Sequence, residues 1–316
     1  LIEKFALLWH KKTKAKIIGI TGSNGKTTTK ELLFSILSNK HKCSKNEGNY
    51  NSLIGLPLSF LNSNLNDDYC ILEYGANKPN EIDYLCKIVK PDYSLITNIS
   101  EAHIGNYSSI DEIFQTKSAI YKNLSVDGVA FINNDIKKIN TIKLNCKKIT
   151  FSIKNDSKNK LTIPSSLEHL NEILFSSYMI ADYLGVEKDI IDKTIYSFEL
   201  PEGRGEKIKI NGLYIINDSY NANPASVKLG LSRLNSVKNK GRKIFIFGDM
   251  LELGKDEVRA HESIAKSINH SKINILLTFG NLSKSTFKNT NNSNIIKKHF
   301  KEHYTLIKYI KKNLKD

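Results

Sequence analysis

A glycine-bounded loop with one lysine and two threonines is the segment whose chemistry is easiest to infer. Residues 21–28 read TGSNGKTT, after an apolar run at 15–21 and before helical leucine spacing at 27–38. Glycines let the backbone turn closely around an anion, and the N–H groups at a helix start attract phosphate. Lys26 can reach the terminal phosphates of a nucleotide, and the Thr27 or Thr28 hydroxyl can bind Mg²⁺. The loop therefore predicts a nucleoside triphosphate site, although only two residues separate its glycines instead of the usual four.

Three ionisable side chains are candidates for work beside this loop. Glu73 ends the apolar run YCILE at 69–73, and His103 follows the apolar run at 93–99. The carboxyl ends of parallel strands meet at one edge of a sheet, so both side chains are expected there, at a site suited to Mg²⁺. Lys117 lies inside a predicted helix at 110–124, and from spacing alone it is a solvated helix lysine.

The elements that must position these residues alternate between strands and helices. Strands at 15–21, 69–73, 93–99 and 128–132 and helices at 27–38 and 110–124 predict an α/β fold with a parallel, P-loop-type sheet. The polar run 154–160 is predicted as a loop before a strand at Leu161, and a helix at 167–184 should stop at Gly185. After Pro201–Gly205 the alternation resumes near Glu206, with strands at 213–217, 243–247 and 273–279 and helices at 225–237 and 256–268. This predicts a second, smaller Rossmann-like α/β domain.

Composition limits the class of protein. The chain has 316 residues, 40% hydrophobic and 25% charged, which suits about two ordinary globular domains, and no apolar run is long enough for a membrane span. The net charge of +15 comes from 43 lysines but only 4 arginines, scattered along the chain. Because arginine is the usual reader of phosphate and bases, nucleic-acid binding is not predicted. The basic segment at 297–315 is interpreted as a solvated face of terminal helices, and four scattered cysteines fit a reducing cytoplasm.

Several motifs, in order, resemble one family. TGSNGKTTTKE at 21–31 is similar to the phosphate loop of the Mur ligases, ATP-dependent amide ligases of peptidoglycan synthesis. The series continues with Asn49-Tyr50-Asn51, IGLP at 54–57, EYGAN at 73–77, Ala102-His103 and Lys117-Ser118. DSYNANP at 218–224 and GDMLELG at 248–254 resemble the branch of the family that adds D-alanyl-D-alanine.

The resemblance implies roles for individual residues. Lys26, His103 and an N-carboxylated Lys117 would be catalytic, and Mg²⁺ would be held by Thr27, Glu73, His103 and the Lys117 carbamate. ATP would be bound by a set that spans both domains: Thr21, Gly22, Ser23, Asn24, Gly25, Lys26, Thr27, Thr28, His169, Arg204 and Asp218. The peptide substrates would meet a smaller set: Asn49, Asn51, Tyr220, Asn221 and Asn223.

The implied reaction joins D-alanyl-D-alanine to UDP-N-acetylmuramoyl-tripeptide. ATP would phosphorylate the terminal carboxylate of the tripeptide, and the amine would attack the acyl phosphate, with ATP and two Mg²⁺ as cofactors. The resemblance also implies a cytoplasmic monomer. Its domains would be a linker helix at 1–14 left from an absent UDP-binding domain, an ATP-binding domain at 15–203 and an incomplete C-terminal ligase domain at 204–316.

The chain departs from the family's pattern at three places. Leu170 and Ile173 replace two asparagines of a His-Asn-x-x-Asn block that contributes to the adenine pocket. No UDP-sugar domain precedes the loop, and no Lys-Gly-Ser-Arg segment follows the last helix. Three alternatives therefore stay open: another Mur-type or folyl-polyglutamate-type ligase, an inactive nucleotide-binding relative, or a gene fragment.

Overall fold

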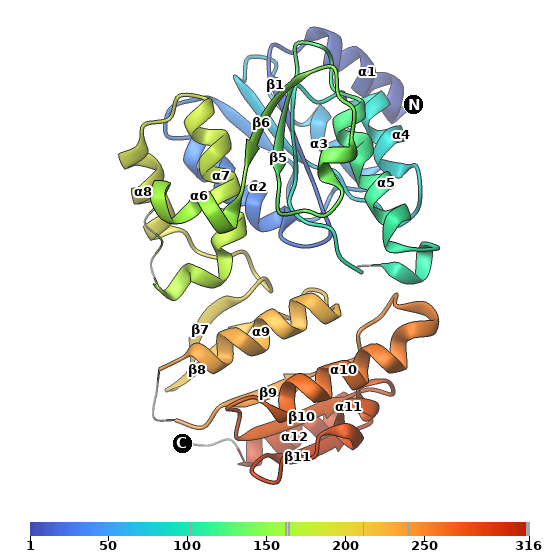
Figure 1. Ribbon diagram of the computed structural model, residues 1–316, viewed down its shortest axis with the longest axis vertical. Helices are drawn as coiled ribbons and strands as arrows, with labels where there is room; N and C mark the ends of the chain where they lie inside the picture. Colours follow the sequence, from blue (N-terminus) through green and yellow to red (C-terminus); the bar gives the residue numbers. More distant parts are fainter. Residues whose placement is uncertain (102, 162, 164, 211, 239–240, 314–316) are drawn as a thin grey trace. The chain divides into compact units, whose positions relative to one another are not determined.

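A computed structural model describes residues 1–101, 103–161, 163, 165–210, 212–238 and 241–313 (Figure 1). The chain forms two compact units. The first unit contains Leu1–Ser100 and Ser109–Glu199, and the second contains Glu101–Ser108 and Leu200–Asp316. The chain thus leaves the first unit for eight residues, shortly after the strand next to the phosphate-loop strand, and then returns.

A parallel sheet forms the centre of the first unit. Among the described residues it has six strands in the order β2-β3-β1-β4-β5-β6. Their bounds are β1 (Lys16–Thr21), β2 (Cys43–Lys45), β3 (Tyr69–Glu73), β4 (Tyr93–Ile96), β5 (Val129–Asn133) and β6 (Lys147–Phe151). Ile17, Ile18 and Ile20 on β1 are fully buried, because a central parallel strand is covered on both faces and reads as a continuous apolar run.

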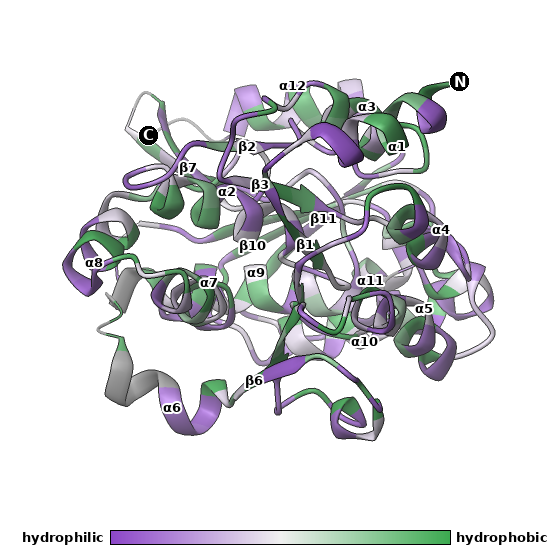
Figure 2. Ribbon diagram, turned by 90° about the horizontal axis from the view of Figure 1, so that it is seen from above, coloured by the Kyte–Doolittle hydropathy of each residue, from purple (hydrophilic) through white to green (hydrophobic). Residues whose placement is uncertain are grey.

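Helices cover both faces of this sheet. Figure 1 shows α7 and α8 on one side of it and α4 and α5 on the other. The helices of this unit are α1 (Ile2–Lys12), α2 (Lys26–Leu37), α3 (Gly55–Leu61), α4 (Glu81–Ile88), α5 (Ile110–Lys122), α6 (Ile153–Lys160), α7 (Asn171–Tyr183) and α8 (Lys188–Ser197), with 3-10 turns η2 (Ile139–Thr141) and η3 (Ser165–Leu170). Helix α2 packs against α7 and α8, and α4 packs against α5. Figure 2 shows hydrophilic and hydrophobic stretches on α4 and α5, as expected of amphipathic helices that cover a sheet.

The second unit is a smaller α/β structure. Within the described residues it has a parallel sheet in the order β11-β10-β9 and an antiparallel pair, β7 with β8. Its elements are η1 (Ile104–Asn106), β7 (Glu206–Ile210), β8 (Leu213–Asn217), α9 (Pro224–Ser236), β9 (Ile244–Phe247), η4 (Gly254–Asp256), α10 (Glu257–Asn269), β10 (Ile275–Phe279), α11 (Ser283–Asn289), β11 (Ile296–Phe300) and α12 (His303–Asn313). Leu276 on β10 joins the core under α9 and α10, whereas Leu277 joins the core with Leu306 of α12, so the sheet is covered on both faces.

The predicted α/β class and the main strands are confirmed. The predicted strand at 93–99 is shorter and ends at Ile96, and the helix predicted from residue 167 begins at Asn171 after a 3-10 turn. Gly185 does end that helical segment, with a φ of +80°.

The loop predicted at 154–160 is wrong, because this segment is helix α6. The Asp135 carboxylate accepts hydrogen bonds from the backbone N–H groups of Ile153 (2.8 Å) and Lys154 (3.2 Å) at the start of the helix. A carboxylate at a helix N-terminus satisfies donors that have no partner within the helix. The predicted strand at Leu161 is also absent from the described structure, where Leu161 is a buried residue outside any strand.

The interpretation of 297–315 as helices alone is wrong as well. Its first part lies in β11, which pairs in parallel with β10, and only the part from His303 is helical. Lys297 and Lys298 extend from a strand, whose backbone is fixed by the ladder that it adds to the β10 edge.

Candidate functional site

The phosphate loop joins β1 to α2 in a conformation that requires glycine. Gly25 caps α2 with a φ of +79°, and Gly22 has a φ of +149°. A Cβ atom on Gly22 would lie 1.9 Å from Oγ1 of Thr97, which is a severe overlap. Lys26 Nζ donates to the Gly22 carbonyl oxygen at 2.9 Å, so the predicted phosphate lysine lies over the loop itself.

Residues that follow β4 hold the loop in place, although the sequence analysis assigned them no role. The Asn24 backbone N–H donates to Oδ1 of Asn98 at 3.0 Å, and Thr97 Oγ1 donates to the Asn24 carbonyl at 2.6 Å. Ser23 Oγ donates to the Ser100 carbonyl at 3.0 Å. The signal was available, because β4 is the parallel neighbour of β1 and the carboxyl ends of such strands meet.

The structure brings two of the predicted metal ligands together. Thr27 Oγ1 donates to Glu73 Oε2 at 2.8 Å, and Asn51 Nδ2 donates to Glu73 Oε1 at 2.7 Å. Glu73 lies at the end of β3 and is 1% exposed. A buried carboxylate beside a hydroxyl, at the start of a phosphate-binding helix, presents the oxygen ligands that Mg²⁺ prefers. Asn49, the other predicted substrate residue of this segment, is exposed.

Lys117 is buried rather than solvated, contrary to its spacing-based interpretation. It lies on α5 and is 3% exposed. Its pKa is lowered to about 7, mainly by burial and also by the positive charge of Lys26, while the negative charge of Glu73 opposes both effects. These electrostatic interactions place Lys117 with the phosphate-loop lysine and the predicted metal carboxylate.

His103 lies in the excursion that belongs to the second unit, directly before η1. Its Nδ1 atom is hydrogen-bonded to the Glu252 carboxylate, and the Gly105 N–H donates to the Glu252 carbonyl at 3.0 Å. Ala102, quoted with it in the motif, lies outside the described residues. The role of His103 as a metal ligand and catalytic residue stays a prediction.

The altered adenine block lies against the phosphate loop. His169 is in η3, Leu170 is buried at 6% exposure, and a Cβ on Gly25 would lie 3.3 Å from the Ile173 side chain. Between them, Glu172 accepts a hydrogen bond from Asn98 Nδ2 at 3.3 Å, and burial raises its pKa to about 7. The replaced positions therefore serve apolar packing. Glu172 is a titratable group next in sequence to Ile173, the residue that lies against Gly25 of the loop.

The predicted residues of the second unit gather at the start of β7 and after β8. The Arg204 guanidinium lies 3.5 Å from the centre of the Tyr220 ring. Burial raises the pKa of Asp218, while the charges of Arg233 and Arg204 lower it. Asn223 caps α9 by accepting from the N–H groups of Ala225 and Ser226, and Asn221 Oδ1 accepts from the Ala222 N–H. The roles of these residues toward ATP and the peptides stay predictions.

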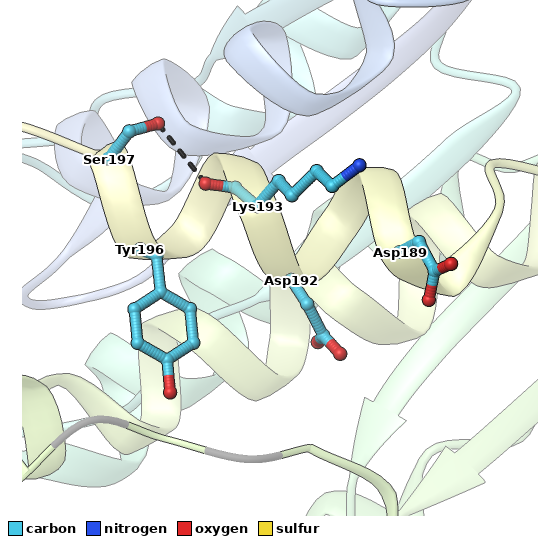
Figure 3. Close-up of a pocket in the computed structure, with 5 residues that line it drawn as sticks. All are labelled: Asp189, Asp192, Lys193, Tyr196 and Ser197. Atoms are coloured by element: carbon cyan, nitrogen blue, oxygen red, sulfur yellow. Dashed lines mark hydrogen bonds between the residues drawn. The ribbon is translucent and has the colours of Figure 1, made fainter.

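A hollow along α8 lies apart from these residues. Figure 3 shows its lining side chains, Asp189, Asp192, Lys193, Tyr196 and Ser197, all from this one helix. It contains none of the predicted site residues, so it takes no part in the site.

Among the described residues, no helix has the length and apolar character needed to cross a membrane.

Comparison with known families assigns both parts of the chain. Residues 20–181 match the Mur ligase middle domain, and residues 203–315 match the Mur ligase glutamate ligase domain. The chain belongs to the Mur ligase family. The predicted resemblance is thereby confirmed, on matches that together cover most of the sequence.

Individual Mur ligases with a similar sequence are UDP-N-acetylmuramoyl-tripeptide–D-alanyl-D-alanine ligases. The one from Buchnera aphidicola subsp. Baizongia pistaciae is 36% identical over 310 residues, which cover 90% of this chain and 67% of the relative. The one from Rickettsia prowazekii is 34% identical over 98% of this chain and 75% of the relative. This Mur ligase chain thus spans about two thirds to three quarters of the length of these relatives.

A solved Mur ligase structure has a similar fold. The structure of MurF ligase from Thermotoga maritima in complex with ADP matches with a TM-score of 0.84 at 26% identity, over 99% of this chain and 77% of that one. The predicted fold, a parallel-sheet domain followed by a smaller α/β domain, agrees with this match.

Proposed function

We propose that this chain is the ATP-dependent part of a ligase that adds D-alanyl-D-alanine to UDP-N-acetylmuramoyl-tripeptide in peptidoglycan precursor synthesis. The relatives with that name support the assignment. The reaction forms an amide bond after the tripeptide carboxylate takes the γ-phosphoryl group of ATP. The amine of D-alanyl-D-alanine then attacks the acyl phosphate, and inorganic phosphate leaves.

The observation that carries this proposal is the joint position of Lys26, Thr27 and Glu73 at one end of the parallel sheet. Lys26 supplies positive charge at the phosphate loop, and the Thr27 hydroxyl donates a hydrogen bond to the Glu73 carboxylate. Preorganised charge aimed at a phosphoryl group is the main source of catalysis in phosphoryl transfer. Mg²⁺, when bound, would neutralise charge on the phosphate oxygens.

Lys117 supports the finer proposal that this site carries a carbamate. Among the described side chains, no group of three or more His, Cys, Asp and Glu residues could hold a metal ion. Carboxylation would turn the buried Lys117 amine into an anionic oxygen ligand that could act together with Glu73 and Thr27. A pKa of about 7 leaves much of this amine neutral near pH 7, and the neutral form is the one that reacts with CO₂.

Calorimetric titration tests the proposal at its first step. The chain is titrated with a nonhydrolysable ATP analogue in the presence of Mg²⁺, and Lys26→Ala should abolish or strongly reduce binding. Lys40→Ala is the matched control, because Lys40 lies just past the other end of α2 and pairs with Glu187. Phosphate release that depends on both the tripeptide substrate and D-alanyl-D-alanine then tests the reaction.

The replacements at the adenine block favour one alternative, an inactive nucleotide-binding relative. Leu170 is buried and Ile173 packs against Gly25, so neither position offers a polar contact. That alternative predicts weak or no nucleotide binding and no amine-dependent phosphate release. The two assays above therefore separate it from the ligase.

Further parts of the assignment are proposals of the same kind. Residues 15–203 would bind ATP, and residues 204–316 would present the incoming amine, with Arg204 and Asp218 toward the nucleotide. A monomer in the cytoplasm remains our prediction for the assembly and location of the protein.

A further inference from the structure

Lys30 is a fully buried lysine of the phosphate-loop helix for which the site described above gives no task. Its side chain has 0% exposure. Its Nζ atom donates to the backbone carbonyls of Asn46 and Gly48 and lies 3.0 Å from Glu31 Oε1. An ammonium group has three donors, so these three acceptors satisfy it completely. A buried charge with a complete set of partners fixes whatever those partners belong to.

Two of the three partners belong to the segment that surrounds Glu73. Asn46 is 0% exposed, its Oδ1 accepts from the Glu73 backbone N–H at 2.9 Å, and its Nδ2 donates to the Tyr50 carbonyl at 2.9 Å. Asn51 then donates from Nδ2 to Glu73 Oε1 at 2.7 Å and accepts from the Gly75 N–H at 2.9 Å. Lys30 therefore fastens a segment that binds both the backbone and the carboxylate of Glu73.

We propose that Lys30 is a positioning residue that holds the 46–51 segment so that Asn51 and Asn46 orient the Glu73 carboxylate toward Thr27. Thr27 and Lys30 lie three residues apart on α2, on neighbouring positions of one helix face. Helix α2 thus contacts Glu73 directly through Thr27 and indirectly through Lys30. We call the contacts of Lys30 with the Asn46 and Gly48 carbonyls the Lys30 clamp. The effect of the clamp on divalent-cation binding rests on the proposed function, whereas the clamp itself does not.

Lys45 provides the matched control. It also pairs with Glu31, through Oε2, and its Nζ lies 4.5 Å from the centre of the Phe34 ring. Lys45→Met removes a cation from Glu31 but leaves both carbonyl contacts of Lys30 in place. Lys30→Met removes those two contacts, and Glu31 keeps Lys45 as its partner.

Mn²⁺ serves as the probe of the metal site. The electron paramagnetic resonance signal of free Mn²⁺ is followed as the chain is added with a nonhydrolysable ATP analogue. Lys30→Met should weaken Mn²⁺ binding by about 10–100-fold, which is the usual effect of losing a group that orients a ligand. Lys45→Met should stay close to wild type. Equal losses in the two variants, or no loss in Lys30→Met, would overturn the metal part of the proposal.

Amide hydrogen exchange tests the clamp without any ligand. The Glu73 and Gly75 N–H groups, which bond to Asn46 and Asn51, should exchange faster in Lys30→Met than in Lys45→Met. Unchanged exchange would refute the clamp. If the wild-type chain fails to bind Mn²⁺ with the analogue, the proposed function fails while exchange still decides the clamp.

A second variant keeps both tests decisive if Lys30→Met does not fold. Asn46→Ala removes the link between the clamped segment and Glu73 without changing any charge. It should weaken Mn²⁺ binding and speed exchange at Glu73 and Gly75 in the same way. Wild-type values for Asn46→Ala would refute the role of the segment.

Discussion

The buried amine of Lys117 makes N-carboxylation a quantitative prediction. At pH 7, a lysine with the ordinary pKa of 10.5 is neutral in only about 0.03% of molecules, whereas a pKa of about 7 leaves roughly half of them neutral. The reactive form of Lys117 is therefore enriched roughly 10³-fold over a solvated lysine. The neutral nitrogen attacks CO₂, an N–C bond forms, and the nitrogen loses a proton to give the carbamate.

¹³C-labelled bicarbonate and NMR would detect this carbamate directly. Because the neutral amine predominates above its pKa, the carbamate signal should rise as the pH passes through about 7 at a fixed CO₂ concentration. The control is Lys122→Ala, which removes an exposed lysine from the same helix and should leave the signal unchanged. Lys117→Arg should abolish it.

The neighbours of Lys117 extend the test in opposite directions. Replacing Lys26 with methionine removes a cation that lowers the Lys117 pKa, so the rise should move to higher pH. Replacing Glu73 with glutamine removes an anion that raises this pKa, so the rise should move to lower pH. Lys117→Ala should lose ligase turnover and recover part of it with short carboxylic acids. A fully active Lys117→Ala, or no carbamate signal in the wild type, would refute the reasoning.

Three further predictions concern the phosphate loop. Lys26→Ala should lower phosphoryl transfer by about 10²–10³-fold with an unchanged unfolding midpoint, and unchanged turnover would refute its role. Gly22→Ala should reduce the free energy of unfolding, measured by urea titration, by about 1–3 kcal/mol. The new Cβ would overlap Thr97 Oγ1, and the φ of +149° disfavours alanine. Equal stability of the variant and the wild type would contradict this. Glu172 ionises as the pH rises through about 7 and then places a negative charge beside the loop. Lys117 titrates in the same range, so ATP-analogue affinity should fall between pH 6 and 8 in both proteins but less steeply in Glu172→Gln than in the wild type, and parallel pH profiles would refute this.

Sequence patterns predicted the parts of the fold whose signals are local. The run of isoleucines in β1 and the glycines of the loop each report their own backbone conformation, so the strand, the turn and the start of α2 could be placed. The polar run of α6 was wrongly predicted as a loop because its local sequence does not show what stabilises the start of the helix. Its cap, Asp135, lies 18 residues before Ile153, and only tertiary structure brings the two together.

From the sequence, only the site residues that end a predicted strand could be placed. Glu73 was expected at the sheet edge because it ends a strand, and its contact with Thr27 bears out that placement. Lys30 gave no such signal, and Asn98 was overlooked although it follows a strand that ends at the same sheet edge. Asn98 bonds to Asn24 across 74 residues of sequence, and Lys30 is one of 43 lysines in a chain where charge alone suggests solvent.

The first two turns of α2 show why burial, rather than residue type, separates these lysines. Lys26 lies at the first residue of the helix, where it can reach an anion bound by the loop, and Lys30 lies one turn later beneath the 46–48 carbonyls. Both are cations that donate to backbone carbonyls, but Lys30 is fully buried whereas Lys26 is only partly buried, so of the two we expect Lys26 to meet phosphate. Lys117 is also buried, and its burial together with the positive charge of Lys26 lowers its pKa to about 7, so its amine is less often charged than that of an ordinary lysine. We therefore expect Lys26 to act on the substrate, Lys30 to hold the protein framework and Lys117 to supply the amine for carbamate chemistry.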